Sequence, residues 1–273
     1  MKQKGSDYVA ESWSELSDIL FADSWNSQIS RYRSDFAYRG VADKSYGLET
    51  SFIRLCGNNK NLEYHLIRNF QKYAPLEDVK RASSIWHWIT LAQHHGLPTR
   101  LLDWTYSPFV ALHFATVETD KYDKDAAIWC VDYVAVNKML PPPLIDVMND
   151  VGSNAFTIGM LDRALGGGID DIKEYDKLSS DLVLFFEPPS IDERIVNQFA
   201  FFSVMSDPTR DLNNWLADHP HLFKRIIIPS ELKWEVRDKL DQANMTERVL
   251  FPGLDGLTRW LSRHYLPKNN TNL

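Results

Sequence analysis

Apolar side chains recur at helical spacing in three stretches of the first hundred residues. Residues 8–30, 60–74 and 82–95 place them at intervals of three and four positions, which is the period of one helix face. Gly96 and Pro98 follow the third stretch, and both residue types end helices. We therefore expect three amphipathic helices, the first followed by a turn and covering the main body of the protein.

Short apolar runs bounded by polar or turn-forming residues predict strands. They lie at residues 36–41, 126–132, 182–187, 199–205 and 225–228. Residues 108–116 form an apolar run that begins with Pro, which favours a buried helix. Further helices are expected at 230–243 and 254–265. The pattern predicts an α+β fold with an N-terminal helical block and a mostly antiparallel sheet with flanking helices.

One long segment lacks a clear period. Residues 135–180 contain three consecutive prolines at 141–143, three consecutive glycines at 166–168 and many small polar residues. Such a composition is typical of loops, so we expect an insertion or a lid over a site. The predicted division of the chain is a helical cover at 1–30, one main domain at 31–266 and a disordered tail at 267–273.

Composition narrows the class of protein. Hydrophobic residues make up 44% of the chain and nine are Trp, which indicates a globular protein with a substantial core. The net charge of −7 argues against a protein that coats nucleic acid through a broad basic face, although a local basic cleft stays open. No stretch approaches the roughly 20 apolar residues that span a bilayer, so we expect a soluble, cytoplasmic protein without a membrane partner.

Residues 91–105 hold the densest group of reactive side chains. Two adjacent imidazoles, His94 and His95, are followed by a guanidinium, a carboxylate, an indole and a hydroxyl. Neighbouring positions on a helix point about 100° apart, so the two imidazoles do not ligate one metal ion in the usual way. We expect one to face a pocket and the other to cap the helix C-terminus. Two cysteines, Cys56 and Cys130, are too few for a zinc site of their own, and no metal is expected.

Several of these side chains have a structural alternative. Arg100 and Asp103 can pair with each other and fix the loop, and Trp104 is equally suited to stacking on a ligand and to filling the core. Thr105 and Ser107 precede the apolar run at 108–116, where hydroxyls are natural helix N-caps.

An arginine outside this segment stands at the end of the predicted strand 36–41. Arg39 is followed by Gly40, whose small size lets a ligand approach the backbone closely. A guanidinium there suits a phosphate, and a salt bridge to one of the many acidic side chains is the alternative.

Residues 36–40 and 91–105 together resemble the FRG family, which is named for a Phe-Arg-Gly triplet. The triplet here is Tyr38-Arg39-Gly40, with Tyr in place of Phe. Segments 194–202 and 246–257 are also similar to the family, so the resemblance covers most of residues 30–265. The main domain at 31–266 is therefore expected to be an FRG domain.

A more distant similarity is to the ADP-ribosyltransferases, and it implies an ADP-ribosyltransferase-like sheet. By this analogy Arg39 holds the phosphates and ribose of NAD, and Thr105 and Ser107 support the nicotinamide side. A third element should bring a carboxylate that stabilises the ribosyl cation. The usual Glu-x-Glu or Gln-x-Glu pair is missing, and Glu187, at the end of an apolar strand, is slightly favoured over Glu193 for this role.

The resemblance thus implies two sets of site residues. The catalytic candidates are Arg39, Glu187 and Glu193. The residues expected to contact NAD are Tyr38, Arg39, Gly40, His94, His95, Thr99, Arg100, Asp103, Trp104, Thr105, Ser107 and Gln198, the last through a ribose hydroxyl.

The first functional hypothesis is an NAD-dependent ADP-ribosyltransferase or NAD glycohydrolase that acts on a protein or nucleic acid. NAD would be its substrate, and a bacterial toxin or phage-defence effector of this kind needs an antitoxin or regulatory protein. The second hypothesis is a non-catalytic module that binds a nucleotide or nucleic acid through Arg39, His95 and Trp104. A hydrolase with a His general base oriented by Asp103 is the third.

Overall fold

A computed structural model describes most of the chain. The described residues are 2–57, 59–75, 77, 82, 84–168, 170–179 and 181–268. Of the tail predicted to be disordered, residues 269–273 lie outside this set. Within the described part, no helix combines the length and apolar character that crossing a bilayer requires.

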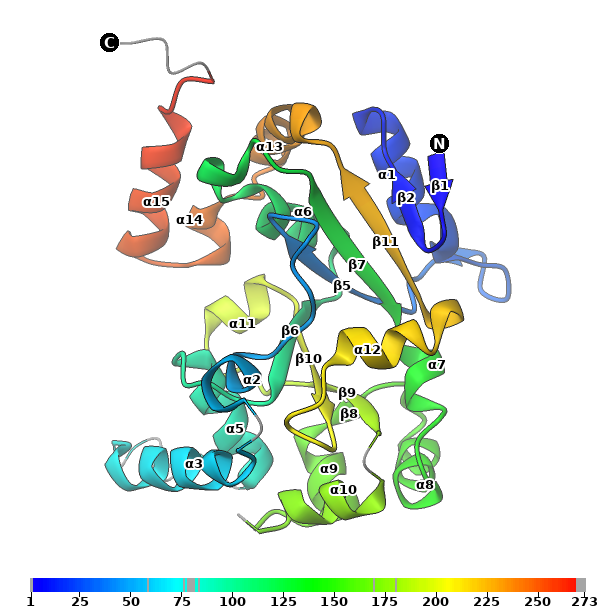
Figure 1. Cartoon of the computed structure of the whole chain (residues 1–273), viewed down its shortest axis with the longest axis vertical. Coiled ribbons are helices and arrows are strands. Elements are labelled where there is room, and N and C mark those ends of the chain that lie inside the picture. The colour runs from blue at the N-terminus through cyan, green and yellow to red at the C-terminus, as the bar shows by residue number, and fades with distance from the viewer. Residues whose placement is uncertain are drawn as a thin grey trace.

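A mixed sheet of nine strands runs through the middle of the molecule in the order β1-β2-β11-β7-β5-β6-β10-β9-β8 (Figure 1). Its strands are β1 (Lys2–Lys4), β2 (Asp7–Val9), β5 (Phe36–Val41), β6 (Leu101–Thr105), β7 (Ala126–Asp132), β8 (Phe156–Thr157), β9 (Val183–Glu187), β10 (Ala200–Met205) and β11 (Phe223–Ile228). Only the β2–β11 and β8–β9 pairs are parallel among these strands. The predicted α+β class and mostly antiparallel sheet are confirmed.

Helices flank the sheet on both faces. Those of eight or more residues are α1 (Trp13–Phe21), α3 (Asn61–Tyr73), α5 (Ile85–His94), α6 (Pro108–Thr116), α8 (Pro142–Val151), α9 (Ile158–Leu165), α13 (Lys233–Gln242) and α15 (Leu254–His264). Shorter ones are α2 (Ser51–Cys56), α7 (Tyr133–Asn137), α10 (Ile172–Leu178), α11 (Glu193–Asn197), α12 (Leu212–Ala217) and α14 (Glu247–Leu250). A small separate sheet pairs β3 (Trp25–Asn26) with β4 (Arg31–Tyr32).

Three sequence predictions of local structure were wrong. Residues 101–105 form a central strand instead of part of a loop, because the polar residues in and before this segment conceal its apolar positions. Residues 135–180 are mostly helical, and Leu144, Phe156 and Leu161 are fully buried in a hydrophobic core. The N-terminal cover contains two strands of the main sheet as well as the predicted helix.

The sheet nearly divides between β5 and β6. Strand β5 pairs with β7 over all six of its residues, and β6 pairs with β10 over five. Between β5 and β6 the register holds for one pair, Tyr38 with Thr105. Two half-sheets are therefore joined at one point, as the separation of the upper and lower strands in Figure 1 shows.

The arrangement of the hydrophobic core follows this division. One face of the sheet carries a single core that spans both half-sheets, from Ile227 and Trp129 through Trp104 to Phe185. The opposite face carries two separate cores, one beneath α6 and α13 and one beneath α5 and α9. A cleft on that face, between the two cores, is the expected consequence.

Candidate functional site

Arg39 lies at the point where the half-sheets part. Its Nη1 donates a hydrogen bond of 2.7 Å to the carbonyl oxygen of Asp103 on β6, a backbone group that continuous strand pairing would otherwise satisfy. Its Nε is buried and has no hydrogen-bond partner among the described residues. Burial lowers the pKa of Arg39, and although Asp103 opposes this shift, the positive charge of Arg54 adds to it. The hydrogen-bond partner of Arg39 is thus a backbone carbonyl. The salt bridge to an acidic side chain, which was the alternative prediction, is not formed with the described residues.

The neighbours of Arg39 in the triplet face helix α6. Tyr38 is 2% exposed, and its hydroxyl shares a 2.7 Å hydrogen bond with the Ser34 hydroxyl. A Cβ on Gly40 would lie 1.8 Å from the carbonyl oxygen of Ala111 on α6. The glycine therefore permits close packing of the helix, which corrects the prediction that it lets a ligand approach.

Trp104, Thr105 and Ser107 all have structural partners. Trp104 is 4% exposed and its indole donates to the Ser203 hydroxyl at 2.9 Å, so it fills the core and offers no free face for stacking. Thr105 Oγ1 donates to the carbonyl of Gln198 at 2.7 Å. Ser107 is the N-cap of α6 and accepts from the amide of Val110, in agreement with the structural alternative.

Asp103 is exposed and is held by a neighbour on α5. Gln93 Nε2 donates to Asp103 Oδ2 at 2.9 Å, and Gln93 Oε1 accepts from Thr99 Oγ1 at 2.7 Å. Thr99 is fully buried. The end of α5, the following loop and β6 are thus tied together by one amide side chain.

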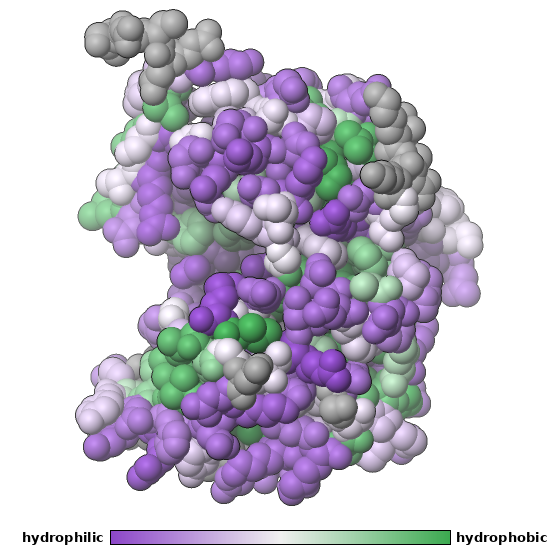
Figure 2. Space-filling model, in the orientation of Figure 1, coloured by the Kyte–Doolittle hydropathy of each residue, from purple (hydrophilic) through white to green (hydrophobic). Residues whose placement is uncertain are grey.

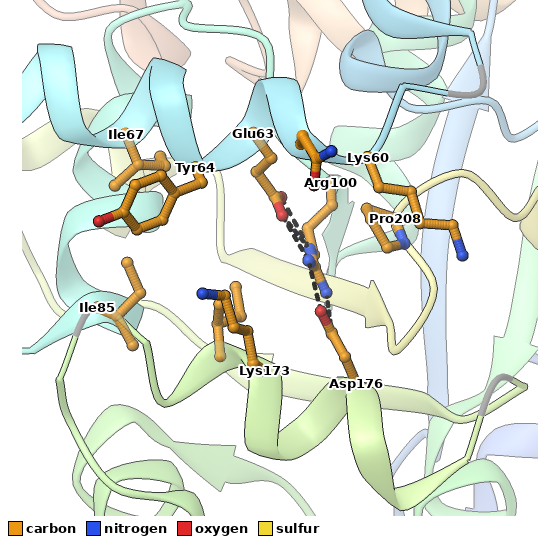
Figure 3. A pocket seen from close by; sticks show the side chains of 11 residues that line it. Lys60, Glu63, Tyr64, Ile67, Ile85, Arg100, Lys173, Asp176 and Pro208 are labelled. Carbon is orange, nitrogen blue, oxygen red and sulfur yellow. Dashed lines mark hydrogen bonds and ion pairs between the residues drawn. The ribbon is translucent and has the colours of Figure 1, made fainter.

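Arg100 is buried in an ion cluster, and its predicted pairing with Asp103 was wrong. Its guanidinium binds Glu63 of α3 on one side and Asp176 of α10 on the other (Figure 3). Burial would lower the pKa of Arg100, but the two carboxylates hold it above its ordinary value. We call Arg100, Glu63 and Asp176 the Arg100 cluster. It lies beside a small pocket of about 230 Å³.

The adjacent histidines diverge as the helix geometry predicts. His94 ends α5, and its Nε2 lies 2.8 Å from Oδ2 of Asp192. His95 is exposed and stands at the C-cap of α5, where it lines an apolar groove with residues of α3. Only His94 faces a cleft that is rich in charged side chains.

Glu187 stands far from Arg39. It ends β9 as an exposed residue and accepts a 3.0 Å hydrogen bond from the Tyr106 hydroxyl, so the expected desolvation is absent. Strand β9 is three positions from β5 in the sheet, which corresponds to about 14 Å. The buried side chains of Phe201 and Trp104 lie on the sheet face between them.

Glu193 lies in the first turn of α11, as the dipole argument predicts. The helix is short and is fixed at its C-terminal end, where Gln198 Nε2 donates to the carbonyl of Leu250 at 2.9 Å. The backbone carbonyl of Gln198 also accepts from Thr105. Gln198 therefore joins α11 to α14 and to the end of β6, and its amide is engaged by the protein itself.

The charged side chains meet in a cleft of about 590 Å³. We use the term charged cleft for this site, which is lined by His94, Asp192, Glu193, Arg194, Phe251, Pro252, Asp255 and Arg259. Figure 2 shows the surface hollowed in this region, between α14–α15 and α11, with hydrophilic and hydrophobic residues side by side at its edges. It occupies the space on the two-core face that the division of the sheet leaves open.

Two arginines on opposite walls of the charged cleft flank one aromatic ring. The guanidinium carbons of Arg194 and Arg259 lie 4.9 and 5.7 Å from the ring centre of Phe251. In the described part of the chain, neither side chain has an ion-pair or hydrogen-bond partner. Three carboxylates, one imidazole and two available guanidinium groups therefore share one site.

The structure brings together only two of the predicted site residues in this cleft, His94 and Glu193. Asp192, Arg194 and Arg259 were missed. The sequence predicts Asp103 as the carboxylate beside a histidine base, whereas Asp192, the partner of His94, is almost a hundred residues away. Arg194 and Arg259 lie on separate helices, so no local spacing connects them.

Comparisons with known proteins bear on the first part of the chain. No curated protein and no solved structure matches the sequence. Among the described residues, no group of three or more His, Cys, Asp and Glu side chains is arranged to hold a metal ion. Residues 34–124 match the FRG domain. This segment runs from before β5 to just before β7. It holds Arg39 and His94, and also Arg100 and Glu63 of the Arg100 cluster. The chain therefore contains an FRG domain at residues 34–124.

Proposed function

We propose that the charged cleft binds NAD and breaks the bond between its ribose and nicotinamide, passing ADP-ribose to an acceptor. The observation that carries this proposal is the meeting of Glu193 and His94, which are 99 positions apart in sequence, in one cleft. The resemblance of the Arg39 and Thr105–Ser107 segments to ADP-ribosyltransferases supplies the reaction type. The acceptor is a protein or nucleic acid, as expected of a toxin or phage-defence effector that a regulatory protein restrains.

The geometry supports Glu193 over Glu187 as the carboxylate of this reaction. Helix α11 lies directly against the end of β6, through the bond from Thr105 to Gln198. Glu193 is exposed to the charged cleft, where its negative charge can stabilise a ribosyl cation as nicotinamide departs. Arg194 and Arg259 are suited to the diphosphate of NAD, because guanidinium groups bind phosphate oxygens in bidentate geometry.

In this proposal Arg39 acts on the framework of the site. Alternation along β5 puts its side chain on the sheet face opposite Tyr38 and Gly40, and therefore opposite α6. By satisfying the Asp103 carbonyl it keeps β5 and β6 joined where their pairing stops. The analogy with ADP-ribosyltransferases gives this arginine the role of holding the phosphates and ribose of NAD. The geometry instead gives it a role in joining the two half-sheets.

The test uses NAD labelled in the adenylate part, incubated with the purified protein and a cell extract. We expect nicotinamide release, with label on one class of macromolecule. Glu193→Gln should lower release by about 100-fold or more while leaving ADP-ribose binding intact, since it removes only transition-state stabilisation. Glu174→Gln, an exposed change on α10, is the matched control. Full release by Glu193→Gln, with loss in Glu187→Gln, would transfer the role to β9.

A binding module without catalysis is the second candidate. It is favoured by the separation of Arg39 from Glu193, because the arginine and the carboxylate of the analogy do not face one site. Under this alternative the charged cleft holds a nucleotide through Arg194 and Arg259 and nothing is cleaved. NAD that stays intact in the presence of folded protein, together with measurable ADP-ribose binding by calorimetry, would establish it.

A further inference from the structure

His94 and Asp192 form a close pair of side chains in the charged cleft. His94 Nε2 and Asp192 Oδ2 are 2.8 Å apart. The other carboxylate oxygen of Asp192 accepts from the amide of Ile195 at 3.1 Å and thereby caps α11. Both oxygens of this carboxylate are thus fixed, one by the helix and one by the imidazole.

The environment of His94 disfavours the protonated form of its ring. Burial lowers its pKa from the ordinary value, Asp192 opposes this, and the positive charges of Arg194 and His95 reinforce the lowering. The other charged groups that line the cleft with His94 are Asp192, Glu193 and Arg194 of the α11 region and Asp255 and Arg259 of α15. A neutral ring that donates from Nε2 to a carboxylate carries no proton on Nδ1.

His94 also keeps access to the cleft. Its side chain is 12% exposed, and it lines the cleft together with Glu193. An imidazole whose tautomer is fixed by a carboxylate, with its second nitrogen unprotonated, has the arrangement of a general base. The sequence offered Asp103 as the orienting carboxylate, but Asp103 is held by Gln93 instead.

We propose that His94, oriented by Asp192, accepts the proton of the acceptor nucleophile in the reaction assigned to this cleft. The bond between C1′ of the ribose and nicotinamide breaks, and its electron pair leaves with neutral nicotinamide. The acceptor oxygen forms a bond to C1′ and releases its proton to Nδ1 of His94, which returns it to solvent. The inference rests on the proposed function and identifies the acceptor as a neutral hydroxyl group, water included.

The test compares two nucleophiles, water and azide, in NAD cleavage by the full chain. Azide is an anion and needs no base, whereas water must lose a proton. His94→Gln should lower the formation of free ADP-ribose by about 100-fold, the usual contribution of a general base, and azide should restore cleavage with a ribosyl azide product. Asp192→Asn keeps a good N-cap on α11 and should reduce the rate by about tenfold.

The pH profile separates a base from a structural residue. Wild-type cleavage in water should fall as the pH drops through the lowered pKa of His94, because the protonated ring cannot accept a proton, and this fall should vanish in His94→Gln. His65→Gln, an exposed change on α3, is the matched control.

Three results would decide against the inference. Wild-type rate and pH profile in His94→Gln would remove His94 from the reaction. Failure of azide to restore that variant would make the histidine structural. Absence of nicotinamide release by the wild-type protein would overturn the proposed function and this inference together, which distinguishes that failure from the other two.

Discussion

The Arg100 cluster and the charged cleft both contain side chains from residues 91–105, yet their arginines differ in whether they are paired with carboxylates. In the cluster, one guanidinium that is 3% exposed lies between two carboxylates. In the cleft, Arg194 and Arg259 are exposed and lean on an aromatic ring without a carboxylate partner among the described residues. The same short segment thus supplies a closed framework at Arg100 and an open site at His94.

The difference teaches that residue type does not separate framework from site. Arginine appears in both regions, and so does carboxylate. What separates them is that the arginine of the cluster is buried and paired with carboxylates, whereas the arginines of the cleft are exposed and have no carboxylate partner in the described part of the chain. Arg100 fixes α3 and α10 against the start of β6. Gln93 holds the end of α5, which carries His94, against the same strand.

The largest effect is expected where the cluster is broken. Arg100→Met should destabilise the protein by about 3–5 kcal/mol, because it leaves the buried carboxylate of Glu63 without its partner. Urea denaturation at pH 7 measures the change. Arg163→Met removes an exposed ion pair with Asp150 and should cost less than about 1 kcal/mol. Equal losses in the two variants would mean that burial does not distinguish the cluster.

The second-largest loss of stability is expected at Gly40 on β5, in the half-sheet that does not contain Arg100. Gly40→Ala places a Cβ 1.8 Å from the backbone oxygen of Ala111, so α6 must move away from β5, at an expected cost of about 2–3 kcal/mol. Gly47→Ala meets nothing within 4 Å and should change stability by less than about 1 kcal/mol. Thermal unfolding of the two variants compares them directly, and an unchanged Gly40→Ala would contradict the close packing.

A third prediction concerns the pH dependence of stability, which buried His113 should influence. His113 on α6 is fully buried and accepts from Arg237 Nη1 at 3.0 Å. Burial, followed by the charge of Arg237, lowers its pKa from 6.5 to about 3. The unfolded chain therefore binds a proton that the folded protein excludes, and stability is lost as the pH falls from about 6.5 toward 3.

This loss can be assigned by substitution. The His113 contribution has a slope of up to about 1.4 kcal/mol per pH unit, and His113→Asn should remove it. Urea denaturation between pH 7 and pH 4 measures the slope in both proteins. The variant can be less stable at every pH, so the comparison is between slopes, and parallel curves would show that His113 does not titrate differently on folding.

Periodic segments could be predicted from the sequence, and the partners of charged residues could not. Helices α3, α5, α6 and α15 and strand β7 lie where the spacing placed them. Strand β6 escaped prediction because the polar residues at 99, 100, 103 and 105 concealed its apolar positions. The helices between 135 and 180 escaped it because Pro and Gly residues stand at their ends, where they terminate helices without excluding them.

The candidate site shows the same limit more sharply. His94 and Glu193 could be selected as reactive side chains, but their common cleft depends on a sheet that divides at Tyr38 and Thr105. Arg100 and Asp103 are close in sequence, and yet each binds a more distant partner. Contacts between residues separated by 50 to 100 positions are set by the topology, which local spacing does not encode.

The smallest change in stability is expected at Arg39. Its burial is intermediate between that of Arg100 and that of Arg194 and Arg259. Its side chain is partly buried, whereas that of Arg100 is almost fully enclosed, and one carbonyl is its only hydrogen-bond partner among the described residues. Arg39→Lys keeps the charge and one donor, so we expect a loss of about 1 kcal/mol in urea denaturation. Arg39→Lys should also bind ADP-ribose as tightly as the wild-type protein, since the phosphate-binding side chains of the proposal are Arg194 and Arg259. A tenfold weaker ADP-ribose affinity, measured by calorimetry on the folded variant, would instead return phosphate recognition to Arg39 and place the ligand at the junction of the half-sheets.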